Sequence, residues 1–232
     1  GFNCIEWLID KRDDDKNIFF DKNFTFFKNE QEKNNILIKS ICLHYYIDNP
    51  INFANAANNY SFTFLESILS ICCINNINNI IFPISDELLK SKSQQLADFF
   101  TRISSLKFIK QNIKILFEVD SEFELSLNLI DSLNKNKEIF GLCYDLGNTN
   151  YLGRSIIYDF KLLNKYIYEI HIKDKDKLGN NVYLGEGNVK FEEFKTEYPK
   201  LEKLNNIIFE TNTYFDPLDT MKKNVKFLRT FL

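Results

Sequence analysis

The sequence predicts an α/β fold in which helices cover a parallel sheet, and three observations predict it. Short apolar runs rich in β-branched residues alternate with longer amphipathic segments along the chain. The apolar runs contain few polar positions, which is typical of parallel strands buried on both faces. The alternation is regular, so each strand is expected to be followed by a helix that covers the sheet.

Seven apolar runs are predicted as strands because they are short and rich in Ile, Val, Phe and Tyr. They cover residues 4–9, 36–43, 79–84, 113–119, 140–146, 166–172 and 206–211.

Amphipathic segments between and after these runs are predicted as helices. Asp86 and Ser121 are predicted as N-caps, since their side-chain oxygens can accept hydrogen bonds from free N–H groups at a helix start. Pro217 suits the first turn of the last helix. The predicted helices cover residues 24–33, 62–73, 86–110, 122–133, 155–164, 191–204 and 216–231.

A closed (β/α)₈ barrel, the TIM barrel, needs eight such units, and the sequence shows seven. The chain starts without Met at a segment that is already strand-like, so we expect the first strand and helix of the barrel to be missing from this sequence. The alternative is a partial barrel or an open sheet, whose apolar edge strand would favour aggregation. No domain boundary is visible, so residues 1–232 are predicted to form a single barrel domain.

The composition fits one enzyme-sized domain, with 44% hydrophobic residues and a net charge of −3. This charge argues against a nucleic-acid partner. No apolar stretch is long enough to cross a membrane, and the first residues lack the layout of a signal peptide. The five cysteines show no CxxC spacing and are predicted to be buried thiols in a reducing cytoplasm.

Four predicted strands each have, at or near the carboxyl end, a residue that can bind a metal ion: Glu118, Asp145, His171 and Glu210. Strand ends converge at one mouth of a barrel, so we expect these side chains to meet there. Three carboxylates and one imidazole suit a divalent cation, and the absence of thiolates argues against a structural zinc site. Any one of the three carboxylates alone is more often a solvated residue or a helix N-cap, and the histidine alone could be satisfied by a backbone partner at the barrel rim. The prediction therefore depends on the combination.

The segments around these residues are FEVDSEFE, YDLGNTNYLG, EIHIKDKDKLGNNVYLGEGNVKFEEF and IIFETN. In this order they resemble the xylose isomerase-like barrel family of sugar and sugar-phosphate isomerases and epimerases. The resemblance covers most of the chain, and HIKD followed by LGEG and VKFEEF is its most specific part. GFNCIEW resembles the second strand of that family and ICLHYY the third, which supports a missing first strand.

The resemblance implies that Glu118, Asp145, His171 and Glu210 are metal ligands. Mn²⁺ is favoured, with Mg²⁺, Co²⁺ and Zn²⁺ left open. Such an ion would polarise a ketose carbonyl and stabilise the enediolate formed when the neighbouring carbon loses a proton. In epimerases of this family two metal-bound glutamates face opposite sides of the substrate, so the resemblance implies catalytic roles for Glu118 and Glu210.

Five further residues are candidates for substrate binding, and four of them have an alternative role. His44 would contact substrate oxygens or cap a strand, and Glu6 would face the substrate or pair with a Lys inside the barrel. Glu124 has the alternative of complementing a helix dipole. Lys173 would attract a phosphate or form an ion pair with the adjacent aspartate. Asn148 stands where free-ketose 3-epimerases usually carry His.

The DLGN segment resembles the pentulose-5-phosphate 3-epimerase and hexulose-6-phosphate isomerase branch of the family. The predicted function is therefore a metal-dependent isomerase or epimerase of a sugar or sugar phosphate. Hydroxypyruvate isomerase and inosose dehydratase remain alternatives, as does a non-catalytic barrel that binds a sugar or a protein. Barrels of this group are often dimers or tetramers, which leaves a homo-oligomer open.

Overall fold

The structure is a computed structural model that describes residues 2–11, 21–51, 53, 60–106, 109, 113–211 and 216–230. The chain divides into two compact units. The first comprises Gly1–Glu118 and Glu124–Gly141, and the second comprises Val119–Phe123 and Leu142–Leu232. The single domain predicted over residues 1–232, and the missing first strand, stay predictions.

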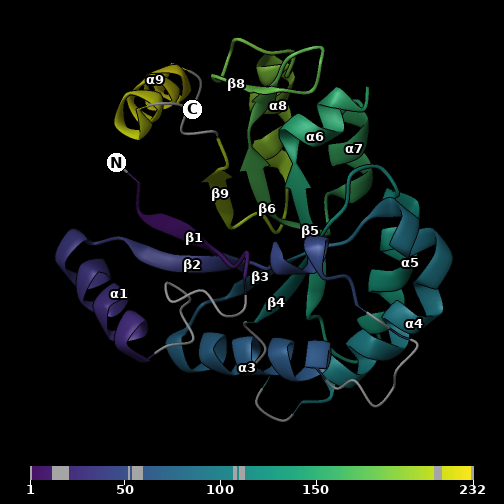
Figure 1. Cartoon of the computed structure of the whole chain (residues 1–232). Coiled ribbons are helices and arrows are strands. Elements are labelled where there is room, and N and C mark those ends of the chain that lie inside the picture. The colour runs from purple at the N-terminus through teal and green to yellow at the C-terminus, as the bar shows by residue number, and fades with distance from the viewer. Residues whose placement is uncertain are drawn as a thin grey trace. The chain divides into compact units, whose positions relative to one another are not determined.

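The first unit contains four strands that pair in parallel in chain order. Their central residues form its core, and the ring of Phe100 lies 5.1 Å from that of Phe82 and 4.8 Å from that of Phe117. Figure 1 shows α3 and α4 together on one side of these strands. The elements of this unit are β1 (Cys4–Leu8), α1 (Asp21–Asn34), β2 (Leu37–Cys42), α2 (Tyr45–Asp48), α3 (Tyr60–Asn75), β3 (Asn79–Pro83), α4 (Asp86–Ser104), β4 (Lys114–Glu118) and most of α5 (Phe123–Leu133).

The second unit is built on β5, β6 and β9, which also pair in parallel. Tyr144 on β5 packs against Phe160 on α7, with ring centroids 5.0 Å apart, so this helix is held against the strand. The elements are β5 (Phe140–Asp145), α6 (Leu146–Tyr151), α7 (Ile156–Leu163), β6 (Ile167–Ile172), β7 (Asp174–Lys175), β8 (Asn181–Val182), α8 (Phe191–Glu197), a 3₁₀ turn (Tyr198–Lys200), β9 (Asn206–Phe209) and α9 (Pro217–Arg229).

The predicted α/β class is confirmed, because the predicted strands pair in parallel within each unit, in the orders β1-β2-β3-β4 and β5-β6-β9, and alternate with helices along the chain. The short helices α2 and α6 and the antiparallel hairpin β7–β8 were not predicted. The predicted ends of two helices, at residues 110 and 231, lie outside the described residues. Among the helices that the structure describes, none has the length and apolar character needed to cross a bilayer.

Two predicted details of the helix starts have different outcomes. Ser85, rather than Asp86, is the N-cap of α4, and its side chain accepts a hydrogen bond from the N–H of Leu88. Pro217 is the first residue of α9, as predicted, and follows Asp216 as the N-cap. All five cysteines are free, and four of them are buried, while Cys4 is partly exposed.

Candidate metal centre

Three of the predicted ligands lie at the carboxyl ends of the neighbouring strands of the second unit. Asp145 is the last residue of β5 and is the register partner of His171 on β6. Glu210 directly follows β9, and its N–H donates to the carbonyl of Ile172 at 3.1 Å. His171 lies within β6 rather than at its end, because Ile172 continues the strand. Parallel pairing in this register therefore brings the three side chains to one place.

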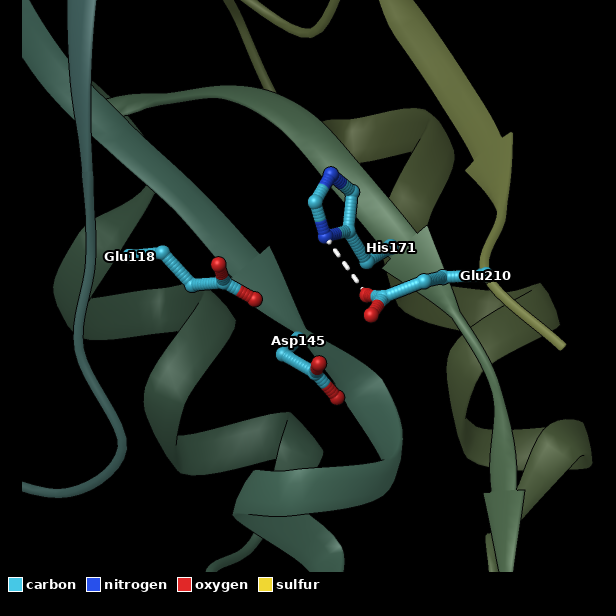
Figure 2. Close-up of side chains that lie close together, drawn as sticks. All are labelled: Glu118, Asp145, His171 and Glu210. Carbon is cyan, nitrogen blue, oxygen red and sulfur yellow. Dashed lines mark ion pairs between the residues drawn. The ribbon is translucent and has the colours of Figure 1, made fainter. Parts of the chain in front are cut away.

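A fourth charged side chain, Lys173, joins this cluster. Its Nζ lies 2.6 Å from Asp145 Oδ2 and 2.8 Å from Glu210 Oε2. His171 Nδ1 lies 2.9 Å from the same Glu210 oxygen (Figure 2). The side chains of Asp145, His171 and Lys173 are at most 8% exposed, whereas that of Glu210 is 46% exposed. The cluster is therefore buried except on the side of Glu210.

Glu118 is the last residue of β4 and is partly buried. Because it lies in the first unit, its place in the donor set stays a prediction. Within the second unit, one ligand atom each from Asp145, His171 and Glu210 lies within 4.8 Å of the others. Ligands 2.0–2.2 Å from one ion lie up to about 4.4 Å apart. The donor set thus fits a divalent cation by chemistry and nearly by spacing, and the exposed Glu210 has room to adjust.

Glu210 is ionised at neutral pH, as a metal ligand must be. Desolvation raises the pKa of its carboxyl group, but hydrogen bonding to His171 and the positive charge of Lys173 outweigh this effect. Together they lower the pKa to about 2. The carboxylate of Glu210 is thus stabilised by the groups of opposite charge around it.

The two oxygens of Asp145 have different partners. Oδ1 accepts a hydrogen bond from the N–H of Asn148 at 2.8 Å and so caps α6. Oδ2 faces Lys173. The side-chain amide of Asn148 donates to Asp120 Oδ1 at 3.2 Å, so it is engaged by the loop after β4. Only Oδ2 of Asp145 is left to face a cation.

Glu169 was missed by the sequence analysis, although it lies behind His171 on the same face of β6. Its Oε1 is 3.9 Å from His171 Nε2, and its Oε2 accepts a hydrogen bond from Asn206 at 2.9 Å. A carboxylate behind a metal-binding histidine commonly fixes the orientation of the ring. The alternation of strand side chains was the available signal, because it places Glu169, His171 and Lys173 on one face.

The expected ion pair between Lys173 and Asp174 is wrong, because the buried Asp174 carboxylate is surrounded by backbone donors. Its oxygens accept hydrogen bonds at 2.9–3.0 Å from the N–H groups of Lys175, Gly185, Gly187 and Val189. The glycine amides of LGEG are therefore used inside the protein and are not free to bind a phosphate group.

Gly185 gives a testable prediction about this loop. Its φ is +87°, and a Cβ there would lie 2.4 Å from Cε2 of the Phe227 ring on α9. Gly185→Ala is expected to lower the free energy of unfolding by about 1–3 kcal/mol more than Gly153→Ala, measured by urea denaturation. Gly153 is the matched control, since its φ is +76° but a Cβ would meet nothing within 4 Å. Equal losses in the two variants would contradict the clash with Phe227.

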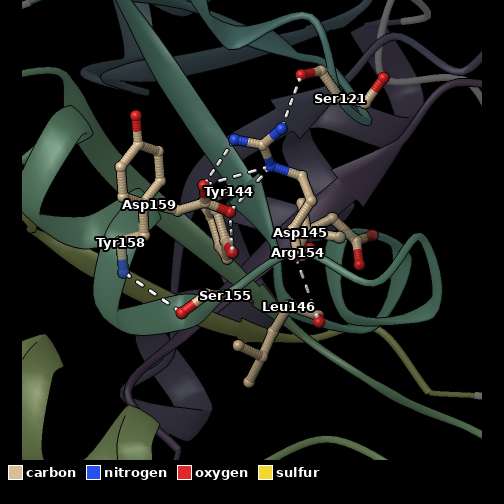
Figure 3. Close-up of polar contacts among 9 residues, drawn as sticks. Ser121, Tyr144, Asp145, Leu146, Arg154, Ser155, Tyr158 and Asp159 are labelled. Carbon is tan, nitrogen blue, oxygen red and sulfur yellow. Dashed lines mark hydrogen bonds and ion pairs between the residues drawn. The ribbon is translucent and has the colours of Figure 1, made fainter.

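A buried network next to the cluster also escaped the sequence analysis (Figure 3). The carboxylate of Asp159, which is fully buried, accepts hydrogen bonds from Arg154 Nη2 at 2.6 Å and from Tyr144 Oη at 3.0 Å. Arg154 Nη1 donates to the carbonyl of Ser121 at 3.1 Å, and its guanidinium lies 4.5 Å from the centre of the Phe123 ring. Tyr144 precedes Asp145 on β5, so this network supports the strand end that carries a candidate ligand.

The remaining predicted substrate-binding residues belong to the first unit. His44 precedes α2, and its Nδ1 lies 3.2 Å from Asp10 Oδ1 with both side chains about half exposed. Glu6 lies in the middle of β1 and is partly buried, and Glu124 is exposed in the first turn of α5. Their roles in substrate binding stay predictions.

Comparison with known proteins places the chain among barrels of one family. The family model described as "Xylose isomerase-like TIM barrel" matches residues 1–231. No curated protein matches the sequence significantly.

Several solved structures share the fold at low sequence identity. One of them is the structure of IOLI protein with a binding zinc atom. The alignment covers the full length of this chain and 88% of that chain, at a TM-score of 0.72 and 14% identity. A second alignment covers 99% of this chain and 89% of the probable 3-DHS dehydratase AsbF from Bacillus anthracis, with a TM-score of 0.73 and 17% identity. The chain also aligns over its full length with 87% of D-allulose 3-epimerase from Methylomonas sp. in complex with D-allulose, with a TM-score of 0.69 and 15% identity. At these identities the likeness shows the fold.

Proposed function

Because the chain belongs to the xylose isomerase-like TIM barrel family, we propose that it is a divalent-metal-dependent isomerase or epimerase of ketoses or ketose phosphates. The observation that supports the proposal is the cluster of Asp145, His171 and Glu210 at neighbouring strand ends. Glu118, the last residue of β4, is the proposed fourth ligand. Oxygen and imidazole donors of this kind suit Mn²⁺, our first choice, and also Mg²⁺, Co²⁺ and Zn²⁺. The zinc atom in the IOLI protein supports a metal in this fold.

A metal ion held by these four residues would polarise a ketose carbonyl and make the neighbouring C–H more acidic. Glu210 is the proposed first carboxylate, because it lies at the cluster and its side chain is partly open to solvent, where a substrate would enter. Glu118 is the proposed second carboxylate. If the proton returns to the same carbon from the opposite face, the product is an epimer, and if it returns to the adjacent carbon, the product is an isomer.

The substrate is proposed to be a sugar, and the residues around the centre bear on whether it carries a phosphate. Asn148 occupies the position at which free-ketose 3-epimerases usually carry His, which supports the sugar-phosphate branch. The LGEG amides are bound to Asp174, so a phosphate group would have to be held elsewhere. The complex of D-allulose 3-epimerase with D-allulose supports an unphosphorylated ketose. Both substrate classes therefore enter the test.

A dehydratase is the second candidate, and Lys173 is the observation that favours it. A dehydratase also removes a proton next to a carbonyl, but it then needs an acid to protonate the departing hydroxyl group. The ammonium group of Lys173, which lies within 2.8 Å of both Asp145 and Glu210, could serve as that acid. The probable 3-DHS dehydratase of the same fold supports this alternative.

The test is a screen in D₂O of purified protein that has been stripped of metal and then loaded with Mn²⁺. A panel of ketoses, ketose phosphates and cyclic polyol ketones would be followed by proton NMR and mass spectrometry. A gain of one mass unit next to the carbonyl supports isomerase or epimerase action, and a loss of water supports the dehydratase. Protein that binds Mn²⁺ but exchanges no C–H in any compound would contradict both and leave the non-catalytic binding barrel.

A further inference from the structure

The ammonium group of Lys173 lies where a metal ion would need to bind. It contacts Asp145 Oδ2 at 2.6 Å and Glu210 Oε2 at 2.8 Å, and its side chain is 8% exposed. The other oxygen of Asp145 caps α6, so Oδ2 is the oxygen left for a cation. A divalent ion 2.0–2.2 Å from these two oxygens would also lie next to the ammonium group. Two cations so placed would repel each other and compete for the same oxygens.

Gly147 makes room for this lysine. A Cβ at Gly147 would lie 2.4 Å from Cγ of Lys173, 3.2 Å from its Cδ and 3.1 Å from its carbonyl oxygen. Gly147 lies within α6, where glycine is a poor helix former. The space that the stem of Lys173 needs explains the glycine of DLGN and links this segment to HIKD.

The burial of Asp145 also explains why a cation is needed beside it. Asp145 is fully buried, and an uncompensated buried carboxylate is strongly unfavourable. Lys173 supplies the compensating charge to Asp145 and to Glu210. The same interaction must be broken, at least in part, before these oxygens can bind a metal ion.

We propose that Lys173 is a displaceable internal cation, which neutralises Asp145 and Glu210 when no metal is bound and withdraws from them when a divalent ion enters. The inference rests on the proposed metal centre. It makes Lys173 a residue that weakens metal binding while stabilising the metal-free protein, which is the opposite of what a supporting hydrogen-bond donor would do.

The test measures metal binding by itself. Titration calorimetry with MnCl₂, and separately with ZnCl₂, would compare wild-type protein with Lys173→Met. We expect the variant to bind each metal at least about tenfold more tightly, because no ammonium group competes. In EDTA its urea-unfolding midpoint should fall, and added metal should raise that midpoint by more than in the wild type.

Two further variants make the result specific. Gly147→Ala keeps the lysine but forces its stem to shift, because the added Cβ would lie 2.4 Å from Cγ. A shifted ammonium group should hold the carboxylates less well, so metal binding should tighten by a smaller factor. If Lys173→Met does not fold, Gly147→Ala is the variant that tests the inference. Lys177→Met removes an exposed charge of the same chain segment and should leave metal affinity unchanged.

The outcomes separate this inference from the proposed function. If Lys173→Met binds metal as weakly as the wild type or more weakly, the inference that Lys173 is a displaceable cation is wrong, but the proposed metal centre is not contradicted. The same holds for Gly147→Ala if Lys173→Met does not fold. If neither the wild type nor the variants bind either metal, the metal centre itself is wrong, and the inference fails with it.

Discussion

Arg154→Met is expected to lower the free energy of unfolding by about 3–5 kcal/mol, because it would leave a buried carboxylate without its cation. The carboxylate belongs to Asp159, whose side chain is 0% exposed and which accepts hydrogen bonds from Arg154 Nε and Nη2. Tyr144 would remain as a neutral donor to Asp159. Urea denaturation followed by circular dichroism measures the loss.

The control for Arg154 is an exposed cation of the adjacent helix. Lys161→Met on α7 removes the same charge from an exposed position and is expected to change stability by less than about 0.5 kcal/mol. A double variant, Arg154→Met with Asp159→Asn, should recover part of the loss, since no unpaired buried charge remains. A loss below about 1 kcal/mol in Arg154→Met alone would show that the pair does not stabilise the second unit.

Glu210→Gln is expected to have the largest effect on function. The variant keeps the shape of the side chain but removes the charge that lies 2.8 Å from Lys173 Nζ and 2.9 Å from His171 Nδ1. An amide is a poor metal ligand and cannot accept a proton as a carboxylate does. We expect most of the bound Mn²⁺ to be lost, and C–H exchange on a substrate found in the screen to slow by roughly 10²–10⁴-fold.

Two measurements test this prediction: metal content by mass spectrometry, and the rate of C–H exchange on the substrate in D₂O. Glu186→Gln is the matched control. Glu186 is an exposed glutamate of the LGEG segment, and its substitution removes the same charge. It should retain metal and activity. Full metal content and full exchange in Glu210→Gln would remove Glu210 from the proposed centre.

Much of the fold could be predicted from local features. The strands that end at Glu118 and Asp145 each stop one residue before the predicted end of the apolar run. The apolar character of the strands identified the class because buried parallel strands need it along their whole length. The helices α2 and α6 were missed because each is shorter than two full turns and carries no recognisable amphipathic period.

The candidate site was predicted in part for the same reason. Asp145, His171 and Glu210 could be found because each lies at or near the carboxyl end of an apolar run, and such ends meet in a parallel sheet. Glu169 was within reach of the alternation rule, since it lies two residues before His171. The partner of Lys173 was predicted wrongly because sequence neighbours were preferred over residues distant along the chain.

The sequence by itself determined the α/β class, the family resemblance and the residue types at the strand ends. These depend on periodicity and on short motifs, which are local properties of the chain. Only the tertiary structure decided which charges meet: Lys173 with Asp145 and Glu210, Arg154 with Asp159, and Asp174 with the amides of its loop. Such pairs are set by strand register and by the path of the loops, and electrostatic energy depends on distances through space that spacing along a chain does not encode.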